Sequence, residues 1–280
     1  AGAGIAATKC CFGLNMALHG NKLYIPRMYL GWGRDADGWT GVSSESADWR
    51  GFRIIDVTVP SQPSVIADVD LVDLKTDDSI NPQFLHIEAT DSHVFLLDFP
   101  GEGEYWNDCQ DGNVIRIHNT SSPYAEVAKL NVGDAGSFDV HGSFLYTTVC
   151  DQFKIYNISD LSNITEVATL KNQLTEVWLG DVKKSGNYVY LSPYTWDDWD
   201  KKVAIIDVTH HTDPVLVATI PVEYNVGTVE VSGGHVYVPQ QSFYSLDEDA
   251  SNPLVKGNLS IYQNNFAPQP FSLMFPPDGM

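Results

Sequence analysis

One phrase recurs five times in this chain, and it restricts the folds that the chain can adopt. Each copy is a segment of alternating apolar residues, a tight turn and a second alternating segment; the copies begin at Leu14, Phe84, Phe138, Trp178 and Gly227. A second phrase follows each copy after a loop of variable length, as in GFRIIDVTVPSQPSVIADV and KVAIIDVTHHTDPVLVATI. Self-similarity at a period of about fifty residues is typical of a propeller or a solenoid.

The repeated phrases have the two-residue period of β-strands, as in Lys22-Leu23-Tyr24-Ile25. A short glycine-containing turn such as His19-Gly20-Asn21 separates the first two strands. A third strand follows, and we predict it at Phe52–Val57, Val114–Ile117, Phe153–Tyr156, Val203–Val208 and Leu259–Tyr262. A fourth strand comes next, for example Ser64–Val69 and Val215–Ile220.

Four strands in each of five repeats predict an all-β chain, a five-bladed β-propeller of four-stranded antiparallel blades. We expect one domain over residues 1–280, with blades at approximately 12–70, 84–132, 136–170, 176–222 and 227–276. The fifth repeat supplies its own outer strand in this prediction, at Pro270–Phe275.

The phrases IIDVTVPSQPSVIADV and AIIDVTHHTDPVLVATI, each preceded by strands of the form G-x-x-x-Y-x-P/S, resemble the LVIVD-repeat family of β-propeller proteins. The likeness extends from Phe12 to Phe275 and is closest in repeats one and four. It implies a propeller and an extracellular or cell-surface location, since the family is mostly found there, and it implies no particular reaction.

The formal net charge of −20 comes from 36 acidic and 16 basic residues. It argues against nucleic acid as a partner, because phosphates demand a basic surface. Cations, cationic partners and neutral partners held by aromatic contacts stay open. The sequence has no run of about eighteen apolar residues, so we expect no transmembrane segment.

The cysteines and glycosylation sequons favour an extracellular protein. Cys10, Cys11, Cys109 and Cys150 lack the C-x-x-C spacing of a zinc site, and four cysteines are compatible with two disulfides in any of three pairings. Sequons for N-glycosylation stand at Asn119, Asn157, Asn163 and Asn258, as expected of a secreted glycoprotein.

Aromatic and acidic residues gather in the loops between the predicted second and third strands. Six of the seven tryptophans lie there, and only Trp178 lies on an inner strand. Exposed aromatic rings beside carboxylates suit sugars, and long loops on a rigid scaffold often carry function. The predicted ligand-binding residues are Trp32, Trp39, Trp49, Tyr105, Trp106, Tyr194, Trp196, Trp199 and Tyr244. The alternative is that these rings fold back and cap the blades.

Two acidic clusters in the same loops suggest a calcium ion. Asp35 and Asp37 belong to the D-x-D-G start of a calcium loop, and Asp197, Asp198 and Asp200 offer further hard oxygen ligands. The complete twelve-residue EF-hand pattern is absent, so a solvated acidic surface is the alternative.

A second group of acids falls on the predicted inner strands. Alignment of the first strands on their turns puts Glu88, Asp139, Asp181 and Glu230 at one equivalent position, provided that the turn after Asp181 is slightly longer than the others. His86 and His141 lie two residues away from Glu88 and Asp139. Paired carboxylates are the groups that glycosidases use as acid and base. Alternatively, these acids accept hydrogen bonds from backbone amides of the next blade.

These features predict a secreted or cell-surface propeller that binds a ligand, with carbohydrate as the expected class, on the loops between strands two and three. One alternative is a glycoside hydrolase or polysaccharide lyase that uses the channel-mouth carboxylates. Another is a structural module of an extracellular assembly, in which Cys10 or Cys11 links chains. The adjacent His210 and His211 resemble a metal pair, but we expect them to serve in a turn.

Overall fold

The structure of the protein is a computed structural model. It describes residues 16–27, 32–35, 38–41, 51–71, 83–99, 112–133, 135–149, 152–171, 178–194, 202–222, 225–226, 229–241 and 257–263. The described residues form strands and turns, and no helix among them is long and apolar enough to cross a bilayer.

The chain is an all-β propeller of five four-stranded antiparallel blades, as the repeats predict. Two compact units divide the blades, residues 1–133 and 134–280. The first unit holds blades one and two, with sheet orders β1-β2-β5-β6 and β10-β9-β8-β7. Their strands are β1 (Ala17–His19), β2 (Lys22–Arg27), β5 (Gly51–Asp56), β6 (Ser64–Asp70), β7 (Gln83–Ala89), β8 (His93–Phe99), β9 (Asn113–Asn119) and β10 (Glu126–Gly133).

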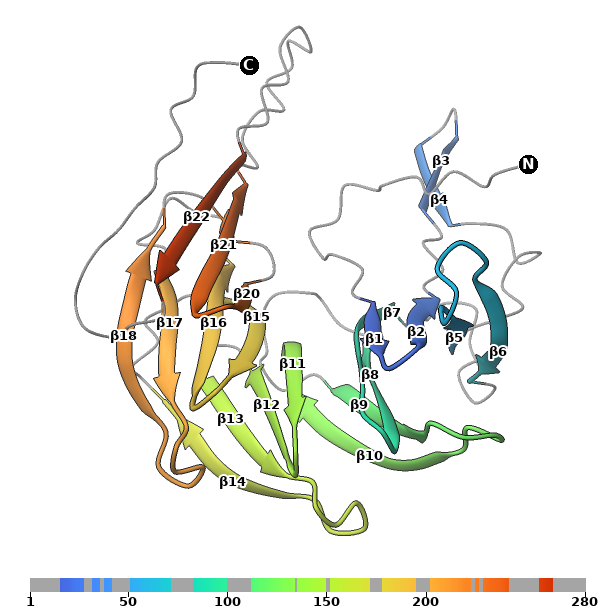
Figure 1. The fold of residues 1–280 in the computed structure, drawn as a ribbon, viewed down its shortest axis with the longest axis horizontal. Coiled ribbons are helices and arrows are strands. Elements are labelled where there is room, and N and C mark those ends of the chain that lie inside the picture. The colour runs from blue at the N-terminus through green and yellow to red at the C-terminus, as the bar shows by residue number, and fades with distance from the viewer. Residues whose placement is uncertain are drawn as a thin grey trace, which may run out of the picture. The chain divides into compact units, whose positions relative to one another are not determined.

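The second unit holds blades three, four and five (Figure 1). Blade three consists of β11 (Ala135–His141), β12 (Phe144–Val149), β13 (Gln152–Asn157) and β14 (Thr165–Leu170). Blade four consists of β15 (Trp178–Ser185), β16 (Tyr188–Tyr194), β17 (Lys202–Asp207) and β18 (Val215–Pro221). Blade five consists of β19 (Asn225–Val226), β20 (Glu230–Ser232), β21 (His235–Gln241) and β22 (Gly257–Gln263).

The third strands confirm the prediction in every blade, and so do the fourth strands predicted at Ser64–Val69 and Val215–Ile220. Blade five departs from the simple pattern, because β19 and β20 both pair with β21 on the edge away from β22. Its first strand is therefore built in two pieces. The outer strand predicted at Pro270–Phe275 lies outside the described residues.

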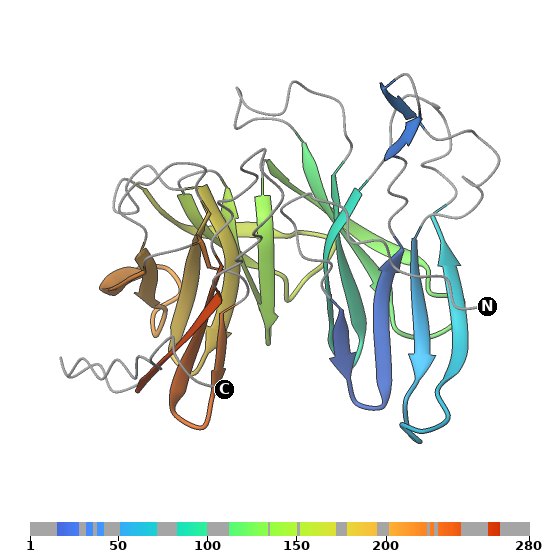
Figure 2. The ribbon, with the colours of Figure 1, turned by 90° about the horizontal axis from the view of Figure 1, so that it is seen from above.

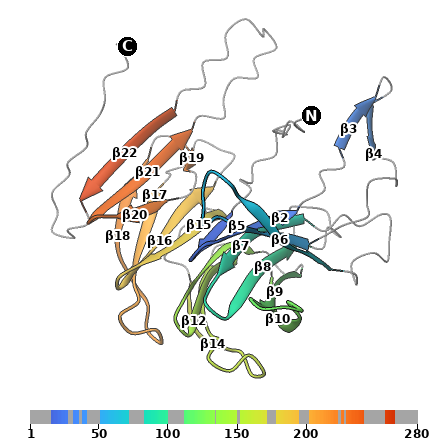
Figure 3. The same cartoon turned by 45° about the vertical axis from the view of Figure 1, so that its right-hand side comes forward.

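Apolar residues join neighbouring blades face to face within each unit. Figure 2 shows the strands of blade one (blue) beside those of blade two (green). Between them, Tyr24, Phe52 and Ile54 of blade one pack with Ile87 and Leu96 of blade two. In the second unit, one cluster joins blades three and four, with Phe153 and Ile155 against Val189 and Ile206. Blades four and five lie side by side (Figure 3). Another cluster joins them, with Tyr190 and Val203 against Val236 and Val238. This burial is the main source of stability expected for such sheets.

The polar residue at the end of the third strand closes the turn into the fourth. Asp56, Asn157 and Asp207 each accept the backbone N–H two residues later, at 2.8–2.9 Å. This Asx-turn needs Asp or Asn at its first position and tolerates Ser or Thr at its third. The sequon at Asn157 therefore has a structural explanation that requires no glycan.

Candidate functional site

The inner strands of the blades place one residue of each first strand opposite an aromatic residue of the second. The pairs are Ala17 with Tyr24, Glu88 with Phe95, Asp139 with Tyr146, Lys183 with Tyr190, and Glu230 with Tyr237. Lys183, and not Asp181, thus occupies this position in blade four. The turn after β15 is no longer than the others, so the alignment that put Asp181 there is wrong. A β-bulge between Leu179 and Val182 separates Asp181 from the regular register.

In the second unit, the inner-strand acids connect neighbouring blades. The Oδ2 atom of Asp139 in blade three accepts the backbone N–H of Lys184 in blade four at 2.6 Å. The Ser137 hydroxyl of blade three donates to Oδ1 of Asp181 in blade four at 2.8 Å. Between blades four and five, Lys183 Nζ lies 3.7 Å from Oε2 of Glu230. These contacts match the alternative in which the acids hold blades together.

Burial distinguishes Asp139 from Glu230. Asp139 is only 8% exposed, whereas the side chain of Glu230 is 57% exposed. A buried carboxylate that accepts a backbone N–H contributes more to stability than an exposed ion pair does. Asp139 therefore has a stronger structural role than Glu230.

The remaining two inner-strand candidates lie together in blade two. His86 and Glu88 are two residues apart on β7 and extend from the same face of the strand. Nε2 of His86 lies 3.4 Å from Oε1 of Glu88, and His86 is 6% exposed. The pair is long for a hydrogen bond and partly shielded from solvent.

The predicted aromatic loops are the connections between the second and third strands, here called the tryptophan loops: residues 28–50, 100–112, 195–201 and 242–256. The first contains a hairpin that the sequence did not predict, formed by β3 (Trp32–Asp35) and β4 (Gly38–Gly41). Its register pairs Arg34 with Trp39 and Trp32 with Gly41. Tyr194 is the last residue of β16. Trp49, Tyr105, Trp106, Trp196, Trp199 and Tyr244 lie outside the described residues.

Of the predicted calcium ligands, only Asp35 lies in the described part of the chain, where its backbone pairs with Gly38 across the hairpin. Asp37, Asp197, Asp198 and Asp200 lie outside it, as do all four cysteines. The residues that the structure does describe contain no group of three His, Cys, Asp or Glu side chains placed to hold a metal ion.

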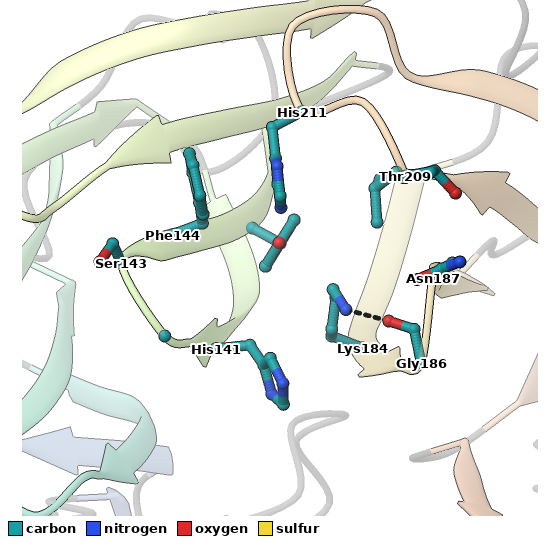
Figure 4. A pocket seen from close by; sticks show the side chains of 11 residues that line it. His141, Ser143, Phe144, Lys184, Gly186, Asn187, Thr209 and His211 are labelled. Carbon is teal, nitrogen blue, oxygen red and sulfur yellow. Dashed lines mark hydrogen bonds between the residues drawn. The ribbon is translucent and has the colours of Figure 1, made fainter.

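A pocket of about 310 Å³ opens between the turns of blades three and four, and we call it the turn-end pocket (Figure 4). The side chains that matter most in its lining are His141, Phe144, Tyr146, Lys184 and His211. His141 and Phe144 flank the β11–β12 turn, Lys184 is near the end of β15, and His211 lies in the β17–β18 turn. Sequence reasoning named His141 for the inner-strand group and assigned His211 to a turn.

Ring stacking positions His211 in this pocket. Its ring lies parallel to that of Phe144, with centroids 3.8 Å apart and an interplanar angle of 6°. The centroid of the Tyr146 ring lies 6.2 Å from that of the His211 ring. The contact crosses from blade four to blade three, so no local sequence pattern signals it.

Burial and charge shape the titration of the pocket. Burial lowers the pKa of His141 and His211, and the nearby Lys184 ammonium lowers both further. Burial also lowers the pKa of Lys184, an effect that Asp139 partly offsets. The Tyr146 phenol is fully buried, and this raises its pKa well above the ordinary value.

Comparisons with known proteins agree on the fold. The LVIVD repeat model matches residues 132–171, which contain blade three, and residues 180–221, which cover blade four except its first two residues. No curated protein matches the chain.

Three solved structures share the fold at low identity. A functionally unknown protein from Desulfotomaculum acetoxidans DSM 771 is 10% identical over 83% of this chain and 66% of its own, with a TM-score of 0.56. The computationally designed Ika8 protein is 8% identical over 89% and 57%, with a TM-score of 0.51. A protein from Lactobacillus plantarum is 13% identical over 89% and 69%, with a TM-score of 0.51. The chain thus spans about two thirds or less of the length of the first two.

The two repeat matches fall on blades whose strands follow the repeated phrases, and blades one and two are built on the same strand order. The chain is a five-bladed β-propeller that contains two LVIVD repeats, in blades three and four.

Proposed function

We propose that this propeller is a secreted or cell-surface binding protein that holds a carbohydrate on its tryptophan loops. The observation that carries the proposal is that two of the four inner-strand acids are engaged in hydrogen bonds between blades. Asp139 and Asp181, which a glycosidase would need free for chemistry, each accept a hydrogen bond across the boundary between blades three and four. Binding at the loops then explains the unusual residues better than catalysis at the inner strands.

The composition of the loops supports a sugar ligand. Six tryptophans lie in the stretches between second and third strands, which the blades do not need for their pairing. An aromatic ring covers the apolar C–H face of a sugar, and neighbouring carboxylates accept hydrogen bonds from its hydroxyls. The acids Asp35, Asp37, Asp197, Asp198 and Asp200 would supply oxygen ligands for a calcium ion that organises the loops.

The extracellular location rests on the family resemblance and on the even number of cysteines. Of the four sequons, the one at Asn157 is accounted for by its turn, so it adds nothing to this part of the proposal.

Affinity electrophoresis through gels that contain single polysaccharides, with and without calcium, tests the proposal. We expect retardation in at least one gel, and we expect Trp39→Ala, Trp106→Ala or Trp196→Ala to abolish it while the melting temperature stays nearly unchanged. Trp178→Phe is the matched control, since Trp178 is the tryptophan that lies on a blade strand. The proposal would be overturned if all four variants were retarded as much as the unmodified chain. It would also be overturned if no gel retarded the unmodified chain.

Calcium removal gives a separate readout of the metal. If the loops hold the ion, EGTA lowers the melting temperature by several degrees and weakens retardation. An unchanged melting temperature and unchanged retardation would remove calcium from the proposal and leave sugar binding intact.

A further inference from the structure

The turn-end pocket lies at the opposite end of blades three and four from the connections between their second and third strands. In each antiparallel blade, the first-to-second and third-to-fourth turns share one end, and the second-to-third connection lies at the other. The pocket is lined from the β11–β12, β15–β16 and β17–β18 turns. It is therefore a site separate from the tryptophan loops.

The charge of this pocket runs against that of the whole chain. The protein has a formal net charge of −20, yet the eleven residues drawn in its lining include no carboxylate. Three of them carry basic nitrogen: His141, Lys184 and His211. A local basic cavity in an acidic protein attracts small anions and excludes cations.

Polar groups in the pocket are placed without a complete set of partners. The Lys184 ammonium donates a hydrogen bond to the carbonyl oxygen of Gly186, which Figure 4 shows as a dashed line. Its Nζ atom also lies 5.7 Å from the centroid of the Tyr146 ring. An ammonium has three N–H donors, so a ligand oxygen could accept another. The buried Tyr146 hydroxyl has no hydrogen-bond partner among the described residues. Buried polar groups in native proteins nearly always have one.

The geometry favours an anion over a metal ion. A divalent cation would need several imidazole or carboxylate ligands, and no such group of three exists in the described residues. The Lys184 ammonium would also repel a cation. The same ammonium, together with two imidazoles that gain charge at acidic pH, is suited to a carboxylate or phosphate group.

We propose that the turn-end pocket is a binding site for a small oxyanion-bearing ligand, with Lys184 as its counter-charge and His141 and His211 as further donors. The volume of about 310 Å³ limits the ligand to a small molecule or a terminal group of a larger one. The Phe144–His211 stack holds one donor in place before the ligand arrives, which reduces the ordering cost of binding.

Binding in this pocket takes up protons. Lys184 of β15 acts on both histidines, and His210 and the Tyr146 ring lie near His211. Asp139 of β11 acts on Lys184 and Tyr146. An anion beside the imidazoles favours their protonated forms, so affinity rises as pH falls through the range in which they titrate.

The test is a titration of the full 280-residue chain with sodium phosphate and, separately, with sodium succinate. Histidine ring signals are followed by NMR, with sodium chloride of matched ionic strength as the control salt. We expect saturable shifts of the His141 and His211 signals, no shift of His235, and tighter binding at pH about 6 than at about 8. Lys184→Met should weaken binding about tenfold or more.

Matched variants separate the pocket from a general charge effect. Lys183→Met removes the same charge from the neighbouring residue, whose ammonium lies by Glu230 instead, and should leave affinity unchanged. His211→Gln provides a second variant if Lys184→Met fails to fold. A preference for phosphate or for succinate would each support the proposal and name the ligand class. Unsaturable shifts, equal shifts with chloride, or equal losses in Lys183→Met and Lys184→Met would overturn it.

Discussion

Replacement of Asp139 separates a structural carboxylate from a catalytic one. Its Oδ2 atom accepts the Lys184 N–H at 2.6 Å, across the boundary between blades three and four. A hydrogen bond to a charged group contributes about 1.5–3 kcal/mol to stability, and loss of one partner leaves the other unsatisfied. Because Asp139 is 8% exposed, solvent compensates little for the loss. We therefore expect Asp139→Ala to reduce the free energy of unfolding by about 2 kcal/mol.

Two further variants calibrate this value. Asp139→Asn keeps an oxygen acceptor without the charge and should cost about 1 kcal/mol. Glu230→Ala removes an acid from the equivalent position of blade five, where the side chain is 57% exposed and its ion pair is long, and should cost less than about 1 kcal/mol.

Urea unfolding followed by far-UV circular dichroism measures the loss of stability in the three variants, provided that the dependence of the unfolding free energy on urea concentration is the same in each. A loss for Asp139→Ala no larger than that for Glu230→Ala would refute the assignment of Asp139 to blade-to-blade packing. So would full stability of Asp139→Asn combined with loss of a measurable enzymatic activity.

Three other predictions follow from the packing and charges. Gly51→Ala should destabilise the first unit by about 4 kcal/mol or more, because the backbone of Gly51 has φ of 152° and an added Cβ would lie 1.9 Å from the Val69 carbonyl oxygen. Gly142→Ala has open space around it and should cost only about 1–2 kcal/mol of stability. Equal losses of stability in the two variants would contradict this prediction. Arg116→Met should cost about 3–5 kcal/mol in urea unfolding, because it removes the cation whose Nε lies 2.7 Å from Oδ2 of the buried Asp98. Lys154→Met breaks the more exposed pair with Glu166 and should cost under about 1 kcal/mol. Similar losses of stability in the two variants would argue against a buried ionic network. Burial lowers the pKa of His141 and His211 in the folded chain below their ordinary value of 6.5. Between the lowered and the ordinary pKa the unfolded chain binds more protons, so the free energy of unfolding should rise with pH, and His211→Gln should reduce this rise. An unchanged dependence of the melting temperature on pH in His211→Gln would contradict the burial of His211.

The strand content of the fold was predictable because it depends on local signals. The two-residue alternation and the turn residues locate the third strands of all five blades, including Phe153–Tyr156 within β13. The Asx-turn after β17 likewise depends on Asp207 and Thr209, which are two residues apart in the sequence.

Other features depend on geometry that sequence periodicity does not carry. The bulge between Leu179 and Val182 shifts the register of β15, so counting back from the turn put Asp181 where Lys183 lies. The hairpin of β3 and β4 was hidden in a loop rich in tryptophan and aspartate. The turn-end pocket arises only when blade packing brings His211 onto Phe144, residues that are far apart in the chain.

The most direct test of ligand binding without catalysis is to incubate the chain with the polysaccharide panel, with and without calcium, and then to resolve both chain length and co-migration with the protein. The proposed function predicts intact polysaccharide chains that co-migrate with the unmodified protein and do not co-migrate with the Trp196→Ala variant. Shortened chains whose production stops in Asp139→Asn would contradict it and make the protein an enzyme.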